Sequence, residues 1–279
     1  MTVDRSMHAH ASPPSMAVPL ICLAILTGIY LAFALREQRR SPRGWSRWRV
    51  AAFLSGALVL ALGLLPQYLP FSEGDFRQHM IQHLLMGMLA PLGLVMAAPI
   101  TLLLRTMPAK GGRTVAGLFR SGPFHALTHP VTALVLDMGG MAALYFTPLY
   151  SAMMMHPALH YLIHFHFVAA GCLFTWAIAG PDPARRRFSV PARLVVLGIA
   201  IVIHSVLAQL LYAGVWVTVP APLPQLQQAA ELMYYGGDIT EILLAFALVS
   251  TWRPAGGSVV HSADGSDHFT PSAPPRSSP

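Results

Sequence analysis

Residues Met80–Leu104 read MIQHLLMGMLAPLGLVMAAPITLLL, which is 25 residues without a single Asp, Glu, Lys or Arg. An α-helix of about 20 apolar residues crosses the roughly 30 Å hydrocarbon core of a bilayer. This run is long enough for that task, and it is far longer than the roughly 10-residue strands of a membrane barrel. It therefore predicts a protein whose helices span a membrane.

Six further stretches of the chain meet or approach the same length. They are Ala17–Leu35, Val50–Leu65, Pro130–Leu149, Pro157–Ala179, Leu194–Val217 and Ala230–Trp252. Together the seven predict an all-α integral membrane protein, a bundle of seven transmembrane helices that occupies residues 17–252. We expect residues 1–16 to form a polar outward tail, and residues 253–279, rich in Ser, Pro and Gly, to form a disordered cytoplasmic tail.

The composition of the whole chain supports a membrane protein. Hydrophobic residues make up 54% of its 279 residues, charged residues only 10%, and the mean hydropathy is +0.55. A soluble domain carries about 25% charged residues, so the composition argues against a soluble enzyme, a disordered chain and a disulfide-stapled secreted domain. The two cysteines, Cys22 and Cys172, differ by about 15 Å in predicted depth, which is too far for a disulfide.

The basic residues indicate the orientation of the bundle. Of the 18 Lys and Arg residues, 16 fall after the first, third, fifth and seventh predicted helices, and only Arg5 and Arg77 fall on the other side. Because loops rich in Lys and Arg stay in the cytoplasm, we expect the N-terminus to face outward from a bacterial cytoplasmic (inner) membrane and the C-terminus to face the cytoplasm. The net charge of +7 is then a signal of topology, and we expect no nucleic acid partner.

Two histidines and a methionine lie at the start of the third predicted helix. An ionisable side chain inside a bilayer costs at least about 2.5 kcal/mol, so it needs a partner or a function. His79, His83 and Met86 fall on one stripe of an α-helix, where an i, i+4 histidine pair can chelate a metal ion and a thioether favours copper(I). Hydrogen bonds to neighbouring helices are the alternative role for the two histidines.

The fifth predicted helix carries a second set of histidines. His156, His160 and His164 follow one another at steps of four residues, so adjacent pairs can share a metal ion, although all three cannot. We expect His166, which points away from this face, to hydrogen-bond to another helix. The loop before the helix contains Met153–Met155, which serve either as an apolar lid on the membrane surface or as soft ligands for incoming copper.

Carboxylates supply the third set of candidate ligands. Asp238 and Glu241 lie on one face of the seventh predicted helix, at about one-third of its depth from the outer side, and we expect the histidines to be their partners. His204 lies nearer the middle of the sixth helix, and Asp137 lies in the cytoplasmic half of the fourth, where we expect it to pair with an Arg or a helix end. The candidate metal ligands are His79, His83, Met86, His156, His160, His164, Asp238 and Glu241.

At these residues the chain resembles a known family, the multi-pass CtaG family of cytochrome c oxidase assembly factors, which is distinct from the single-pass copper chaperone that shares the name. The similarity extends in order over residues 50–252. The matching segments are His79–Met86 with Ala90-Pro91 and Ala98-Pro99, then Pro148–Tyr150, His160 with His164, Leu173–Trp176, and Gln227-Gln228 through Met233 to Gly236–Asp238.

Three positions depart from the pattern of that family. Tyr145-Phe146 stand where a Trp-His is usual, Ile163 replaces an acidic residue, and Leu226 replaces an Asp. The resemblance implies a seven-helix protein, without enzymatic activity, that helps to build haem–copper oxidase at its copper centres. It implies copper as the metal, bound at the outer face and delivered to an oxidase copper centre. The implied partners are cytochrome c oxidase subunits, the lipid bilayer and a soluble periplasmic copper chaperone.

Other classes of protein also use histidines on membrane helices. Integral-membrane di-iron enzymes contain His-x-x-x-His motifs, but they place many more histidines on the cytoplasmic side, where this chain offers little beyond His125 and His129. A b-type haem protein needs two axial histidines at similar depth, for which His83 and His160 are candidates. A secondary transporter would contain a repeated pair of interrupted helices, and only Pro91 in the third predicted helix suggests one.

Overall fold

The computed structural model describes residues 17–42, 44–72, 74–119, 121–182, 188–250 and 252. All regular structure in these residues is helical, which confirms the predicted all-α class. The predicted tails at 1–16 and 253–279 lie outside the described residues. So do several of the basic residues behind the predicted orientation, namely Arg43, Arg120 and Arg185–Arg187.

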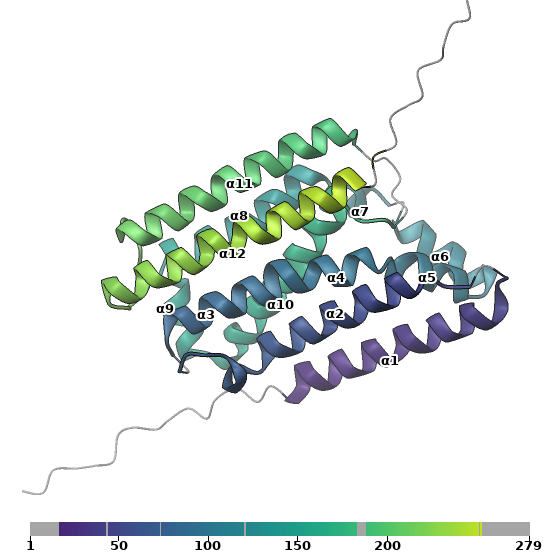
Figure 1. The fold of residues 1–279 in the computed structure, drawn as a ribbon, viewed down its shortest axis with the longest axis horizontal. Helices are drawn as coiled ribbons and strands as arrows, with labels where there is room; N and C mark the ends of the chain where they lie inside the picture. The colour runs from purple at the N-terminus through teal and green to yellow at the C-terminus, as the bar shows by residue number, and fades with distance from the viewer. Residues whose placement is uncertain are drawn as a thin grey trace, which may run out of the picture.

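The long helices run roughly alongside one another in a bundle (Figure 1). Helices α1 and α2 form one edge, α11 and α12 form the opposite edge, and α3, α4 and α10 lie between them. The helices are α1 (Ala17–Arg40), α2 (Arg47–Leu64), α3 (Phe76–His83), α4 (Ala90–Met96), α5 (Pro99–Thr106), α6 (Ala109–Phe119), α7 (Gly122–Leu127), α8 (Pro130–Phe146), α9 (Leu149–Met155), α10 (Pro157–Ile178), α11 (Val190–Ala213) and α12 (Leu223–Ser250), with a 3-10 turn η1 (Pro66–Tyr68) and a π-helix η2 (Leu84–Leu89).

Six helical segments of the described chain are long and apolar enough to cross a membrane. They are α1, α2, the run Phe76–Thr106 that contains α3 to α5, α10, α11 and α12. A seventh span forms only if α8 and α9, which meet at a bend of 79°, are counted together. The bend follows Thr147, which has extended backbone angles, and Pro148, which has no N–H to continue the helix.

Two predicted helices are shifted along the chain. Helix α11 ends at Ala213 rather than Val217, because Gly214 adopts the left-handed conformation (φ 66°) that terminates helices. Helix α12 begins at Leu223, seven residues before the predicted Ala230. Glu241 therefore lies about 27 Å from the start of its 28-residue helix, at about two-thirds of the helix length rather than one-third.

The run Met80–Leu104, predicted as one helix, is interrupted twice. The π-helix η2 separates α3 from α4 just before Pro91, whose missing N–H deprives the Gly87 carbonyl of its α-helical donor. A second break falls at Ala98, which has a positive φ of 53° before Pro99 begins α5. The Asp182 carboxylate caps this new helix, since it accepts hydrogen bonds from the backbone N–H groups of Ile100 (3.2 Å) and Thr101 (2.7 Å).

Close contact between glycines holds the π-helix in place. A Cβ atom on Gly171 of α10 would collide with the carbonyl oxygen of Gly87, so only glycine permits the two helices to approach this closely. Gly56 of α2 and Gly93 of α4 make a similar contact, in which a Cβ on Gly56 would lie 2.6 Å from the Leu94 nitrogen. Small residues are the usual means by which membrane helices pack tightly. These contacts fix η2 and its neighbours between α2 and α10.

Candidate functional site

Four histidines from two helices meet inside the bundle. His79 and His83 come from α3 and lie, almost fully buried, against α8 and α10. His164 of α10 lies with its ring centroid 6.4 Å from that of His79, and half-buried His160 lies 4.2 Å from His164 in the same measure. We call His79, His83, His160 and His164 the histidine cluster.

Most ring nitrogens of the buried cluster members have no hydrogen-bond partner. Both nitrogens of His83, both of His164 and the Nε2 of His79 are buried without one in the described part of the chain. A buried polar group without a partner costs about 1–3 kcal/mol. The described structure shows no hydrogen bond for the His83 ring, so it lends no support to the alternative in which His83 is a hydrogen-bonded structural residue. Free nitrogens at adjacent rings are instead what a metal ion requires of its ligands.

Aromatic side chains enclose the cluster. The ring of Tyr150 lies 5.2 Å from that of His79, and Phe167 lies 4.8 Å from His83. Tyr145, fully buried, makes edge contacts with both histidines, and its hydroxyl has no hydrogen-bond partner among the described residues. Tyr145 is one of the positions at which the sequence departs from the CtaG pattern. This difference from the family pattern therefore concerns a residue that contacts the histidine cluster.

Two glutamines, which the sequence analysis did not single out, orient the histidine face of α3. Gln78 donates to the Pro66 carbonyl (2.6 Å), and Gln82 donates to the Gly63 carbonyl (2.9 Å). Both bonds attach one side of α3 to the end of α2 and the turn that follows it. They turn His79 and His83 toward α8 and α10. The sequence signal was present, since each glutamine directly precedes a histidine in the Gln-His pattern of this helix.

The start of α3 is fixed by an ion pair. Asp75 caps the helix by accepting from the Arg77 backbone N–H (2.8 Å), and the Arg77 side chain bonds back to the same carboxylate. Arg77 also donates to Gln228 of α12 (2.6 Å). The hydrogen bonds from the Arg77 side chain hold the pKa of the Asp75 carboxyl below its usual value. The cluster helix is thus tied to α12 at its N-terminal end.

Met86 does not share the stripe of the two histidines. It packs on Gly63 of α2, in a group with Leu60 and Leu64, whereas His83 faces Phe167. The prediction failed because η2 begins directly after His83, and the wider i→i+5 turn holds more residues than an α-turn. Residues beyond His83 are therefore rotated away from the α-helical stripe.

The remaining predicted ligands are dispersed. His156 is exposed at the junction of α9 and α10, and Asp238 is half-buried on α12. Glu241 lies with its Oε1 3.7 Å from the Nδ1 of His204 on α11, so its neighbour is not the histidine cluster. In the described residues no three His, Cys, Asp or Glu side chains converge at metal-binding geometry.

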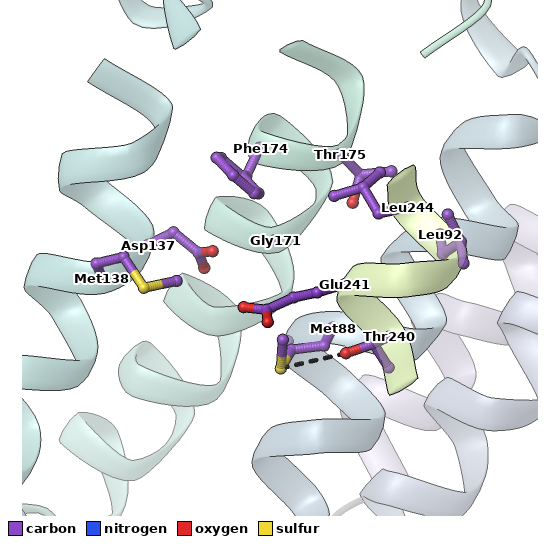
Figure 2. Close-up of a pocket in the computed structure, with 11 residues that line it drawn as sticks. Met88, Leu92, Asp137, Met138, Gly171, Phe174, Thr175, Thr240, Glu241 and Leu244 are labelled. Carbon is purple, nitrogen blue, oxygen red and sulfur yellow. Dashed lines mark hydrogen bonds between the residues drawn. The ribbon is translucent and has the colours of Figure 1, made fainter. Parts of the chain in front are cut away.

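Two smaller predictions are confirmed and one is wrong. His166 hydrogen-bonds to another helix through its Nε2, 3.1 Å from the Leu136 carbonyl oxygen of α8, and both cysteines are free. Asp137 was expected to pair with an Arg or a helix end. It instead faces the same small cavity as Glu241 (Figure 2), because α8 places it on the side turned toward α12.

Helices long and apolar enough to cross a membrane, packed around buried histidines with free nitrogens, indicate a multi-span membrane protein with a candidate metal centre. The chain belongs to the cytochrome c oxidase caa3 assembly factor family (Caa3_CtaG), whose sequence model matches residues 28–255. This match confirms the resemblance found in the sequence.

The chain is also similar to uncharacterized mycobacterial proteins. It is 30% identical to one from Mycobacterium bovis over 247 residues, which cover 82% of this chain and 37% of that protein. It is 31% identical to one from Mycobacterium leprae over 189 residues, which cover 65% of this chain and 29% of that protein. The matched segments cover 37% and 29% of these relatives, so the chain spans well under half of their length. Among solved structures there is no significant match.

Proposed function

We propose that this assembly factor binds copper at the histidine cluster and hands it to a copper centre of the oxidase that it helps to build. The observation that carries the proposal is the pair of buried neighbours His79 and His164, whose rings lie 6.4 Å apart with free nitrogens. Imidazole is a good ligand for copper. A site of few ligands also suits a metal that must be released, unlike a closed cage of four cysteines.

The order of burial along α10 suggests how copper enters. His160 is half-buried and contacts the buried His164, which in turn neighbours His79. Helix α9, which precedes His160, exposes Met154 and Met155 beside the buried Met153. Exposed thioethers at the entrance to buried imidazoles form a graded series of soft ligands. Copper from a soluble periplasmic chaperone would pass along this series.

In this proposal the bundle keeps the orientation predicted from its Lys and Arg residues. The cluster end of the bundle, with α9 and the start of α10, faces outward from a bacterial cytoplasmic membrane, and the start of α1 lies on the same side (Figure 1). Cytochrome c oxidase subunits dock alongside and receive the metal. In this role the chain is a carrier that catalyses no reaction, and copper is its cargo.

The test measures copper in the purified protein by mass spectrometry. The protein is extracted in detergent from copper-supplemented cells, together with His79→Ala/His164→Ala and the control His125→Ala, which lies outside the cluster. We expect the double variant to contain one copper ion per chain fewer than the wild type and the control. Equal copper in all three proteins, or iron in place of copper, contradicts the proposal.

A further inference from the structure

A second buried polar site lies deeper in the bundle, apart from the histidine cluster. It is a partly open cavity of about 30 Å³ between α4, α8, α10, α12 and η2 (Figure 2). A cavity of this size holds a water molecule or a small ion. The lining side chains that carry oxygen or sulfur atoms are Asp137, Met88, Met138, Thr175, Thr240 and Glu241.

Glu241 is the residue of this cavity whose surroundings indicate a bound ligand. It is only 4% exposed, it lines the cavity, and neither of its carboxylate oxygens has a hydrogen-bond partner in the described part of the chain. Its Oε1 lies 3.7 Å from the Nδ1 of His204, an imidazole that forms an ion pair only when it is protonated. In Figure 2 the carboxylates of Glu241 and Asp137 point toward one another across the cavity. Two facing carboxylates in a bilayer are costly unless a proton or a cation is held between them.

The other donors indicate which kind of cation. The thioethers of Met88 and Met138 both line the cavity, and sulfur ligands select soft metal ions. A hard ion such as Ca²⁺ takes six to eight oxygen ligands. The cavity offers two carboxylates and two threonine hydroxyls, of which Thr240 already donates to the Gly237 carbonyl (2.8 Å). The donor set therefore suits a soft ion of low coordination number.

We propose that this cavity is a second metal site, which takes a soft monovalent cation of the copper(I) and silver(I) class. Asp137 and Glu241 supply the charge, and Met88 and Met138 supply the soft ligands. The site shares no residue with the histidine cluster. His204 connects the two regions, since it lies within electrostatic range of His83 and contacts Glu241. A metal ion at Glu241 would thus occupy the middle of the bundle, one step deeper than the cluster.

The test uses silver(I), which does not change oxidation state under the conditions of binding. The full-length protein in detergent micelles is titrated by calorimetry and compared with Met88→Leu/Met138→Leu. Exchange of Met for Leu conserves side-chain volume, so we expect the variant to fold. The matched control is Met96→Leu/Met141→Leu, which removes two thioethers from α4 and α8 that do not line the cavity. We expect one silver equivalent fewer than wild type in the first variant and none fewer in the control.

A third variant separates this proposal from the function proposed above. His79→Ala/His164→Ala removes two members of the histidine cluster and leaves the cavity intact. If silver binding falls in this variant but not in Met88→Leu/Met138→Leu, the second site is overturned and the cluster stands. If it falls only in the methionine variant, the second site stands without the cluster. The same stoichiometry in the methionine variant as in the wild type overturns the second site in every case.

Discussion

At the end of the bundle where α1, α2 and α5 meet, the Tyr30 hydroxyl accepts a hydrogen bond from the Trp45 indole (3.1 Å) and donates to the Ala97 carbonyl (3.1 Å). Where α3 meets α10, the nitrogens of His83 and His164 bond to no described residue. Both regions are buried and both are lined by aromatic rings. Polar groups that stabilise a membrane bundle are paired within it, whereas unpaired ones are available to a ligand. On this difference rests the proposal that the histidine cluster binds a ligand while Tyr30 stabilises the bundle.

The largest expected effect is that of Asp182→Ala, which removes a carboxylate from the region where the polar groups are hydrogen-bonded. Its carboxylate accepts three hydrogen bonds at the start of α5, including one from the Thr101 hydroxyl (2.6 Å). Its loss leaves buried helix N–H groups without acceptors, and we expect the free energy of unfolding to fall by about 3 kcal/mol. Thermal unfolding in detergent micelles measures this, with the exposed Glu231→Ala as control. A loss below that of the control would show that the cap is not structural.

Tyr30→Phe tests the same side with a smaller change. It removes only an oxygen atom, but it leaves the Trp45 indole N–H buried without its acceptor. We expect a loss of about 1–2 kcal/mol in the free energy of unfolding. Tyr212→Phe, at a side chain that is 45% exposed, should change stability little. Equal unfolding midpoints for Tyr30→Phe and Tyr212→Phe would show that the hydrogen bonds of Tyr30 do not stabilise the bundle.

In the region without hydrogen bonds, His83→Leu/His164→Leu should lower the amount of bound copper without lowering the stability of the protein. The rings make no hydrogen bonds, so apolar replacements of similar size remove no bond and relieve two unsatisfied groups. We expect the free energy of unfolding to change by less than about 1 kcal/mol, while bound copper falls. Unfolding midpoints and copper content are measured on the same preparation. A destabilisation as large as that of Asp182→Ala would assign these rings a structural role.

The smallest effect concerns pH and the ion pair at the start of α3. Because Arg77 lowers the pKa of folded Asp75, the pair contributes stability above the ordinary carboxyl pKa of about 3.9, and that stability is lost as pH falls through the lower folded value. Since the pair is partly solvated, we expect less than about 1 kcal/mol. Unfolding midpoints at neutral and at acidic pH should differ less for Asp75→Asn than for the wild type. The same pH dependence in both proteins would exclude the pair as the cause.

The sequence was sufficient for part of this picture. Hydropathy and length identified the long helices, and the i, i+4 spacing identified all four members of the histidine cluster. It placed Met86 with them, however, because an α-helical stripe assumes that the helix stays regular through Leu84–Leu89. The position of Met86 relative to the histidines depends on the π-helical turn, and the pattern of side chains in the sequence does not predict that turn.

The carboxylates show a second reason for failure. The depth of Glu241 was counted from the start of the apolar run, but the polar residues after Pro222 and Pro224 also join α12. Because α12 begins seven residues earlier than predicted, Glu241 lies two turns further along the helix than expected. It is therefore away from the cluster and near Asp137. Asp137 and Glu241 line the same cavity because α8 packs near α12. The spacing of residues along the sequence does not show which helices pack together.

The wide turn at Leu84–Leu89 also makes the side chains that face the cluster sensitive to the length of this helix. A π-turn holds one residue more than an α-turn, so deletion of one residue here would restore a regular α-helix. Such a deletion would return Met86 to the side of His79 and His83. Gain or loss of one residue here would then exchange an all-nitrogen ligand set for a mixed nitrogen and sulfur set, without any substitution at the histidines themselves.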